Sequence, residues 1–256
     1  MRRNAIDLNC DLGEGFGVYQ LGDDAEALTL ISSANVACGF HAGDPHVMRR
    51  TVAQAVSQGV RIGAHPGLPD LLGFGRRRVA ATAEEVRDFF LYQIGALKAF
   101  VETAGARLQH VKPHGAVFEM ALASPAIAAA MCEAARAVDR DLIWLSPAGT
   151  MAGAARQAGL RAMDELYADR AYHPDRTLVS RKTPGAVIED VSLVRARLIQ
   201  WFDTGTVTTI EGGPLALECD SICVHGDTPG AVEIIRLVRA VCAEKGVAVK
   251  PLADLA

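Results

Sequence analysis

The chain has 256 residues, half of which are apolar, and a formal net charge of −4 at neutral pH. This length and apolar content suit one large core, and α/β barrels of about 250 residues normally form one domain, so we expect a single α/β barrel domain over residues 1–256. The net charge is negative and the sequence has no basic stripe, so we do not expect nucleic acid as a partner.

The cysteine spacing and the first residues of the sequence give an expectation for the cellular compartment. The six cysteines show no C-x-x-C spacing, which argues against structural zinc and a disulfide framework. Residues 1–4 run directly into a strand-like segment without a hydrophobic signal core, and no later stretch approaches a membrane span. We therefore expect a cytoplasmic protein with no membrane partner.

Seven short runs resemble strands in their length and pattern, and helical patterns separate them. The runs are residues 6–11, 35–38, 60–64, 110–113, 142–145, 160–163 and 221–224. This alternation predicts a parallel sheet. Polar motifs follow nearly every run, and only a closed barrel gathers all strand ends around one mouth, so we favour a distorted TIM-like barrel over a doubly wound open sheet.

Helix starts and stops recur between these runs. Five helices are predicted to begin at a capping residue followed by proline, namely at Asp44-Pro45, Ser124-Pro125, Ser146-Pro147, Thr183-Pro184 and Thr228-Pro229. A sixth is predicted to begin at Thr82, because Thr82 and Glu85 have the spacing of a capping box. Glycines at positions 59, 105, 159, 205 and 246 are placed to end helices.

Alternation within the strands predicts which side chains face the barrel interior. Polar residues occupy one face of the first and fourth runs: Asp7, Asn9, Asp11, His110, Lys112 and His114. Arg61 and His65 share a face of the third run, so we expect a buried pair between Asp7 and Arg61.

Four histidines end short apolar runs beside glycine or proline, and this repeated setting is the strongest functional signal in the chain. They are His41, His65, His114 and His225. A lone histidine is more often structural, but four in one context predict a shared site at the barrel mouth. The single compact basic cluster, Arg76-Arg77-Arg78, is either a solvated turn or an anion clamp.

Motifs along almost the whole chain resemble those of the LamB/YcsF family. They are DLNCDLGEG at residues 7–15, NVACGFHAGD at 35–44, GAHPG at 63–67, GFGRR at 73–77, HVKPHG at 110–115, ADR at 168–170, PGA at 184–186 and ICVHGDT at 222–228. One departure is Asp175-Arg176, where the family typically has Asp-Gly.

The resemblance implies a barrel related to the glycoside hydrolase and deacetylase barrels. It also implies ATP-dependent opening of the 5-oxoproline lactam to L-glutamate, performed as the A subunit of 5-oxoprolinase with partner subunits B and C. ATP, as Mg-ATP, would then be a co-substrate. The chain has no G-x-x-x-x-G-K-[ST], and the glycines at 13, 15 and 17 give a poor nucleotide signal. If ATP reaches this chain, we therefore expect it to bind at a nonstandard site, or the partner subunits to carry out most of the phosphorylation.

Hydrolysis of an activated lactam needs a base, an acid and an anion clamp. Asp11 or Glu14 can orient or deprotonate water, and the four histidines are candidates for proton transfer. The candidate substrate- and phosphate-binding residues are Asn9, Lys112, Arg76, Asp169, Arg170, Arg181 and Asp227. The sequence leaves the division of roles open.

Two alternatives remain. A metal-dependent amidase or deacetylase of the same barrel type would use Asp11, His41 and His65 as ligands, although the principal hypothesis includes no resident metal. A non-catalytic subunit that binds a small molecule and regulates its partners would tolerate loss of any one proton-transfer residue.

Overall fold

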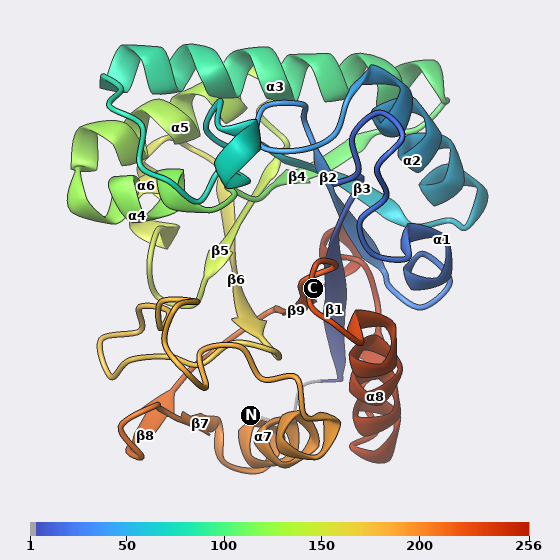
Figure 1. The fold of residues 1–256 in the computed structure, drawn as a ribbon, viewed down its shortest axis with the longest axis vertical. Coiled ribbons are helices and arrows are strands. Elements are labelled where there is room, and N and C mark those ends of the chain that lie inside the picture. Colours follow the sequence, from blue (N-terminus) through green and yellow to red (C-terminus); the bar gives the residue numbers. More distant parts are fainter. Residues whose placement is uncertain (1–3, 256) are drawn as a thin grey trace.

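Seven parallel strands close into a barrel in the computed structural model, which describes residues 4–255 (Figure 1). The barrel strands are β1 (Ala5–Leu12), β2 (Ser33–Ala37), β3 (Arg61–His65), β4 (Leu108–Val111), β5 (Ile143–Pro147), β6 (Arg161–Tyr167) and β9 (Ser221–Val224). Strand β9 pairs with both β6 and β1, so the sheet has no open edge at this point. The predicted barrel is therefore confirmed, and all seven predicted runs contribute a strand.

Helices cover the outside of the barrel, with α3 and α5 packed against each other on one side and α7 and α8 on another (Figure 1). The α-helices are α1 (Asp24–Ala27), α2 (Pro45–Ser57), α3 (Ala83–Thr103), α4 (Ala116–Ala123), α5 (Pro125–Val138), α6 (Ala152–Gln157), α7 (Val191–Thr204) and α8 (Ala231–Glu244). Two 3-10 turns, η1 (Leu71–Gly73) and η2 (Leu252–Asp254), complete the helical elements. Helix α3 buries an apolar stripe, which includes Phe90 and Leu97, against the strands.

Three predicted helix starts are confirmed in detail. Asp44 caps α2 by accepting bonds from the backbone N–H groups of His46 and Val47, and Ser124 caps α5 in the same way. Thr82 and Glu85 form both bonds of the capping box at the start of α3. The five predicted stop glycines all adopt positive φ angles, which close helices at little steric cost.

Two predicted helix starts are wrong, and a third lies two residues early. Pro147 ends β5, and its carbonyl oxygen accepts bonds from Thr150 to form a turn. No helix begins at Thr183-Pro184, because Gly185 enters the left-handed region at φ +80° and the chain makes successive turns. Helix α8 begins at Ala231, since Thr228 bonds to Asp169 instead of capping the helix.

Three short strands were not predicted. Strands β7 (Thr206–Thr208) and β8 (Pro214–Ala216) form an antiparallel hairpin, and β10 (Ala248–Val249) adds to β1. Arg176, at the family's usual glycine position, adopts a left-handed φ of +73° that a glycine would tolerate better. No described helix combines the length and apolar character needed to cross a membrane. The sequence also predicted that residues 1–4 contain no signal segment, and residues 1–3 lie outside the described residues.

Candidate active site at the barrel mouth

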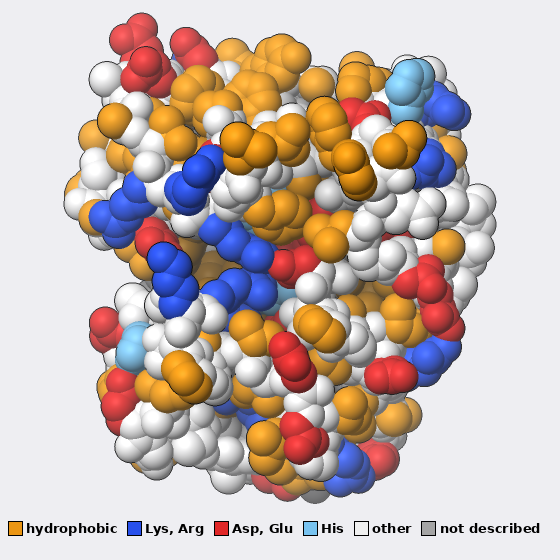
Figure 2. Space-filling view, in the orientation of Figure 1, with side chains coloured by type: hydrophobic (Ala, Val, Ile, Leu, Met, Phe, Trp, Pro, Cys, Tyr) orange, Lys and Arg blue, Asp and Glu red, His pale blue; other side chains and the backbone are white. Residues whose placement is uncertain are grey.

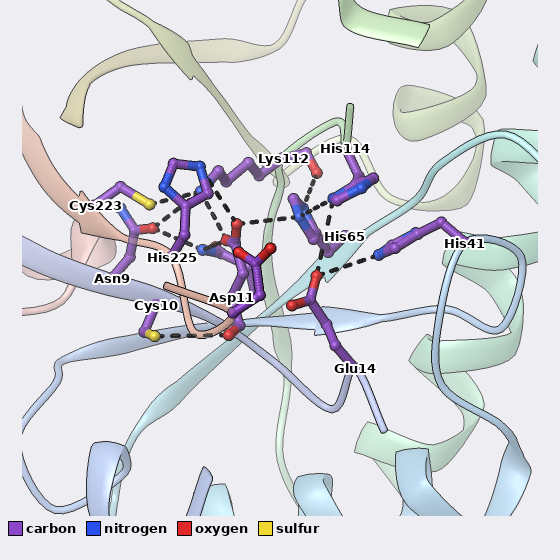
Figure 3. Close-up of polar contacts among 12 residues, drawn as sticks. Asn9, Cys10, Asp11, Glu14, His41, His65, Lys112, His114, Cys223 and His225 are labelled. Atoms are coloured by element: carbon purple, nitrogen blue, oxygen red, sulfur yellow. Dashed lines mark hydrogen bonds and ion pairs between the residues drawn. The ribbon is translucent and has the colours of Figure 1, made fainter. Parts of the chain in front are cut away.

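The carboxyl ends of four barrel strands bring six of the predicted site residues together (Figure 3). The residues are Asp11 and Glu14 at the end of β1, His65 at the end of β3, Lys112 and His114 after β4, and His225 after β9. His41, which follows β2, joins them through Glu14. All seven side chains are at least nine-tenths buried, so the site lies beneath the surface of the mouth.

The rings of His41, His65 and His114 pack tightly together in this site, and we call this group the histidine stack. The rings of His41 and His114 lie parallel with centroids 3.7 Å apart, and the ring of His65 stands perpendicular to both. His65 Nδ1 lies 2.7 Å from the carbonyl oxygen of Lys112, and His114 Nε2 lies 2.8 Å from that of Phe74. These carbonyls fix both rings, leaving His65 Nε2 and His114 Nδ1 facing each other at 3.0 Å.

Glu14 faces the stack. Its Oε1 lies 3.5 Å from His41 Nε2 and 3.9 Å from His114 Nδ1, and neither this oxygen nor the two ring nitrogens of His41 have a hydrogen-bond partner among the described residues. Burial raises the pKa of Glu14 well above its usual value, and the neighbouring charge of Asp11 adds to the effect. Burial lowers the pKa of His41 and of His114, so both rings favour the neutral form.

Lys112 is a buried cation enclosed by acceptors. Its Nζ lies 2.7 Å from Asp11 Oδ1, 3.4 Å from Glu165 Oε2 and 2.9 Å from Cys223 Sγ. Burial alone would lower the pKa of Lys112, but Asp11 and the other acidic groups around the ammonium, which include Glu165, together outweigh burial and hold the pKa well above its usual value. Burial would likewise raise the pKa of Asp11, yet the charges of His65 and Lys112 hold it well below the normal range. The pair is therefore ionised.

Asp169 and His225 form a buried acid–imidazole pair on the other side of Asp11. Both Asp169 oxygens lie within 3.1 Å of His225 Nδ1, and Thr228 donates to the same carboxylate. Burial would raise the pKa of Asp169, but His225 lowers it to about 2. The carboxylate only accepts, so Nδ1 carries the proton and Nε2 is free to take one. His225 Nε2 points toward Asp11 Oδ2 at 4.0 Å.

Two arginines share one carboxylate close to this pair. Figure 2 shows Lys and Arg side chains gathered beside a hollow near the centre of one face. Arg76 and Arg181 contact Asp227 at 2.6 and 3.5 Å, and both guanidinium groups stay partly exposed. Arg170, by contrast, is buried and donates to the carbonyl oxygens of Val179 and Ala186, where it holds a loop.

The expected Asp7–Arg61 pair is wrong. Arg61 is exposed, because the first residue of β3 lies at the opposite end of the barrel from the mouth. Asp7 is fully buried and accepts hydrogen bonds from the hydroxyls of Ser32, Ser33 and Ser221. These hydroxyls replace the expected cation.

The interior network also includes side chains that were not predicted. Asn35 donates to both Asn9 and Asp11, and Asn9 donates in turn to Glu165. Asn9 is completely buried within this network. The alternation used for the first strand, applied to β2 and β6, would have placed Asn35 and Glu165 on inward faces.

Metal-ligand atoms in the site form two groups, each within 4.8 Å. One group is Glu14, His41, His65 and His114, and the other is Asp11, Cys223 and His225. The alternative ligand set of Asp11, His41 and His65 is thus divided between them.

Comparisons with known proteins identify the family. The LamB/YcsF family model matches residues 6–256. The chain is 51% identical to the A subunit of 5-oxoprolinase from Pyrococcus furiosus and 50% identical to that from Rhodopseudomonas palustris, in each case over 97% of this chain and 98% of the relative. The crystal structure of the lactam utilization protein from Thermus thermophilus covers 97% of this chain and all of its own, with a TM-score of 0.90 and 42% identity. The chain therefore belongs to the LamB/YcsF family.

Proposed function

We propose that this chain is the A subunit of an ATP-dependent 5-oxoprolinase, which opens 5-oxo-L-proline to L-glutamate together with subunits B and C. The observation that carries the proposal is the about 50% identity to proteins named as the A subunit of 5-oxoprolinase, along nearly the whole length of both chains. The buried cluster of carboxylates and histidines supports a hydrolytic role for this subunit.

An unstrained lactam resists water, and phosphorylation of its carbonyl oxygen by ATP would make the ring carbon electrophilic and the oxygen a leaving group. Water must then lose a proton as it attacks, and the ring nitrogen must gain one as the C–N bond breaks. We assign the first transfer to His225. Asp169 holds its Nδ1–H, so Nε2 is oriented as a base toward Asp11, which can position the water.

We assign binding of the substrate carboxylate to Arg76 and Arg181. These two cations share the single carboxylate of Asp227, so the three groups together keep a net positive charge. Arginine suits this role because its planar fork matches a carboxylate. Lys112 fits less well than the sequence suggested, because Asp11 and Glu165 already neutralise it.

The test is an assay of ATP-dependent glutamate release from 5-oxoproline, with this chain alone and with its candidate B and C subunits. We expect glutamate and ADP in equal amounts from the complex only. Absence of glutamate from a correctly assembled complex would refute the proposal.

A further inference from the structure

Two imidazole nitrogens in the histidine stack face each other, and in neutral rings neither of them would carry a hydrogen. A carbonyl oxygen only accepts, so His65 must carry its proton on Nδ1, toward the carbonyl of Lys112, and His114 on Nε2, toward that of Phe74. In neutral rings the opposite atoms, His65 Nε2 and His114 Nδ1, are therefore both lone pairs. They lie 3.0 Å apart, which requires a positive charge beside them.

Glu14 and His41 place two further lone-pair atoms beside these two nitrogens. Glu14 Oε1 lies 3.9 Å from His114 Nδ1 and 3.5 Å from His41 Nε2 (Figure 3). Glu14 Oε1 and both nitrogens of His41 are buried and have no hydrogen-bond partner among the described residues. Buried polar atoms almost always have a partner, so Glu14 Oε1 and His41 Nε2, which face each other, indicate that a ligand belongs between them.

We propose that Glu14, His41, His65 and His114 form a binding site for one divalent transition-metal ion of the zinc class. The four ligand atoms lie within 4.8 Å of one another. Ligands at about 2.0–2.1 Å in a tetrahedron lie roughly 3.3 Å apart, close to the separations of 3.0, 3.5 and 3.9 Å between three pairs of these ligand atoms. Three imidazoles and a carboxylate are typical ligands for zinc-class ions.

The surroundings of the rings also match a metal site. Histidines that bind metals usually donate their second ring N–H to a backbone carbonyl or carboxylate, which fixes the tautomer. His65 and His114 both do so. Glycine at position 67 makes room for the third ring, because a Cβ there would lie 2.7 Å from His41 Nδ1.

A proton is the simplest rival occupant. A proton on His65 Nε2 would bond to His114 Nδ1 or to Asp11 Oδ2, which lies 3.4 Å away. It would leave Glu14 Oε1 and His41 Nε2 without partners, whereas a metal ion would bind both of these atoms as well as His65 and His114.

The second group of ligand atoms is a weaker candidate. Lys112 Nζ lies 2.7 Å from Asp11 Oδ1 and 2.9 Å from Cys223 Sγ, and Asp169 occupies Nδ1 of His225. A cation there would have to compete with the ammonium of Lys112. The proposed metal site differs from the sequence-based hypothesis, which included no resident metal, and it does not depend on the proposed reaction.

The experiment measures metal binding directly on the full chain after treatment with a chelator. Titration calorimetry with Zn²⁺ should give one equivalent per chain, and Co²⁺ should produce the intense visible absorption of a tetrahedral site. His41→Ala and Glu14→Gln should each weaken Zn²⁺ binding by at least about a hundredfold, because loss of even an outer partner costs roughly 10- to 100-fold. His41 makes no hydrogen bond, so its removal should leave the circular dichroism spectrum unchanged.

Two controls separate this site from other histidines and from the second group. His46→Ala removes an exposed histidine on α2 and should bind Zn²⁺ like the wild type. Cys223→Ser should also retain the site. The proposal is overturned if the chelator-treated wild type binds neither metal, if both His41→Ala and Glu14→Gln bind like the wild type, or if Cys223→Ser abolishes binding.

Discussion

At the scale of single residues, Lys112 shows how partners decide the effect of a substitution. The sequence placed Lys112 among the candidate substrate- and phosphate-binding residues, a role in which its loss would affect turnover more than stability. The structure instead places Lys112 between two buried carboxylates, Asp11 and Glu165, which its removal would leave without a cation. We therefore expect Lys112→Met to lower the free energy of unfolding by about 3–5 kcal/mol.

Chemical denaturation measures this effect, and Lys98→Met is the control. Lys98 pairs with Asp139 near the surface, where an ion pair contributes less than about 1 kcal/mol. Equal, small losses from the two variants would contradict the buried ion pairs described for Lys112.

Asp7 should give stability a distinct pH dependence. Burial raises its pKa to about 6, although three serine hydroxyls oppose the shift. A carboxyl with a raised pKa binds its proton more tightly in the folded state, so its stabilising contribution is present below the unfolded value of 3.8 and is lost as the pH rises through about 6.

The measurement compares the wild type with Asp7→Asn, which cannot titrate. Between about pH 4.5 and 7.5, the unfolding free energy of the wild type relative to the variant should fall by about 2 kcal/mol. A difference independent of pH would show that Asp7 is ionised throughout. Other buried groups titrate in both proteins, so their effects cancel.

At the scale of elements, the period-two pattern predicted the inward faces of β1 and β4 correctly. It failed for Arg61 because alternation fixes the face of a strand but not the depth, and a first residue can reach solvent at the barrel end. The cap-plus-proline pattern failed at Thr183-Pro184, since the same residues also favour turns and Gly185 extends the turn.

Glycine at position 63 of β3 is required by the packing inside the barrel. A Cβ there would overlap the ring of His110, whose Nε2 lies 2.6 Å from Asn35 Oδ1. Gly63→Ala should therefore lower the free energy of unfolding by about 2–4 kcal/mol, through overpacking and a displaced hydrogen bond.

The matched control is Gly95→Ala in α3, where a Cβ meets no atom within 4 Å. This change should stabilise the protein by about 0.5–1 kcal/mol, because alanine favours helix. Thermal or chemical unfolding of the two variants checks both signs. Gly63→Ala as stable as the wild type would contradict the tight contact with His110.

At the scale of the whole molecule, the number of barrel strands and the shared location of their polar ends were predictable from repeated local patterns. The partners within the site were not predictable, because they depend on register between distant segments. The contact of His65 with His114 spans 49 positions, and that of Lys112 with Asp11 spans 101. Sequence alone could not show that Lys112 is neutralised or that Asp169 orients His225.

We expect the isolated chain to hydrolyse neither 5-oxoproline nor ATP at a useful rate. The sequence lacks a recognisable phosphate-binding loop, so activation of the lactam should need surfaces from other chains. Product analysis of the purified chain checks this. Equal release of glutamate and ADP, with no partner found by mass spectrometry, would contradict it.

The most direct test of proton transfer by the Asp169–His225 pair is the turnover of His225→Gln in the reconstituted complex. We predict a loss of glutamate formation of about 10²- to 10⁴-fold with assembly unchanged, because the variant lacks the base at the mouth. His173→Gln is the matched control, since His173 forms an exposed pair with Glu211 and should retain full turnover. Turnover of His225→Gln equal to that of this control would contradict the account.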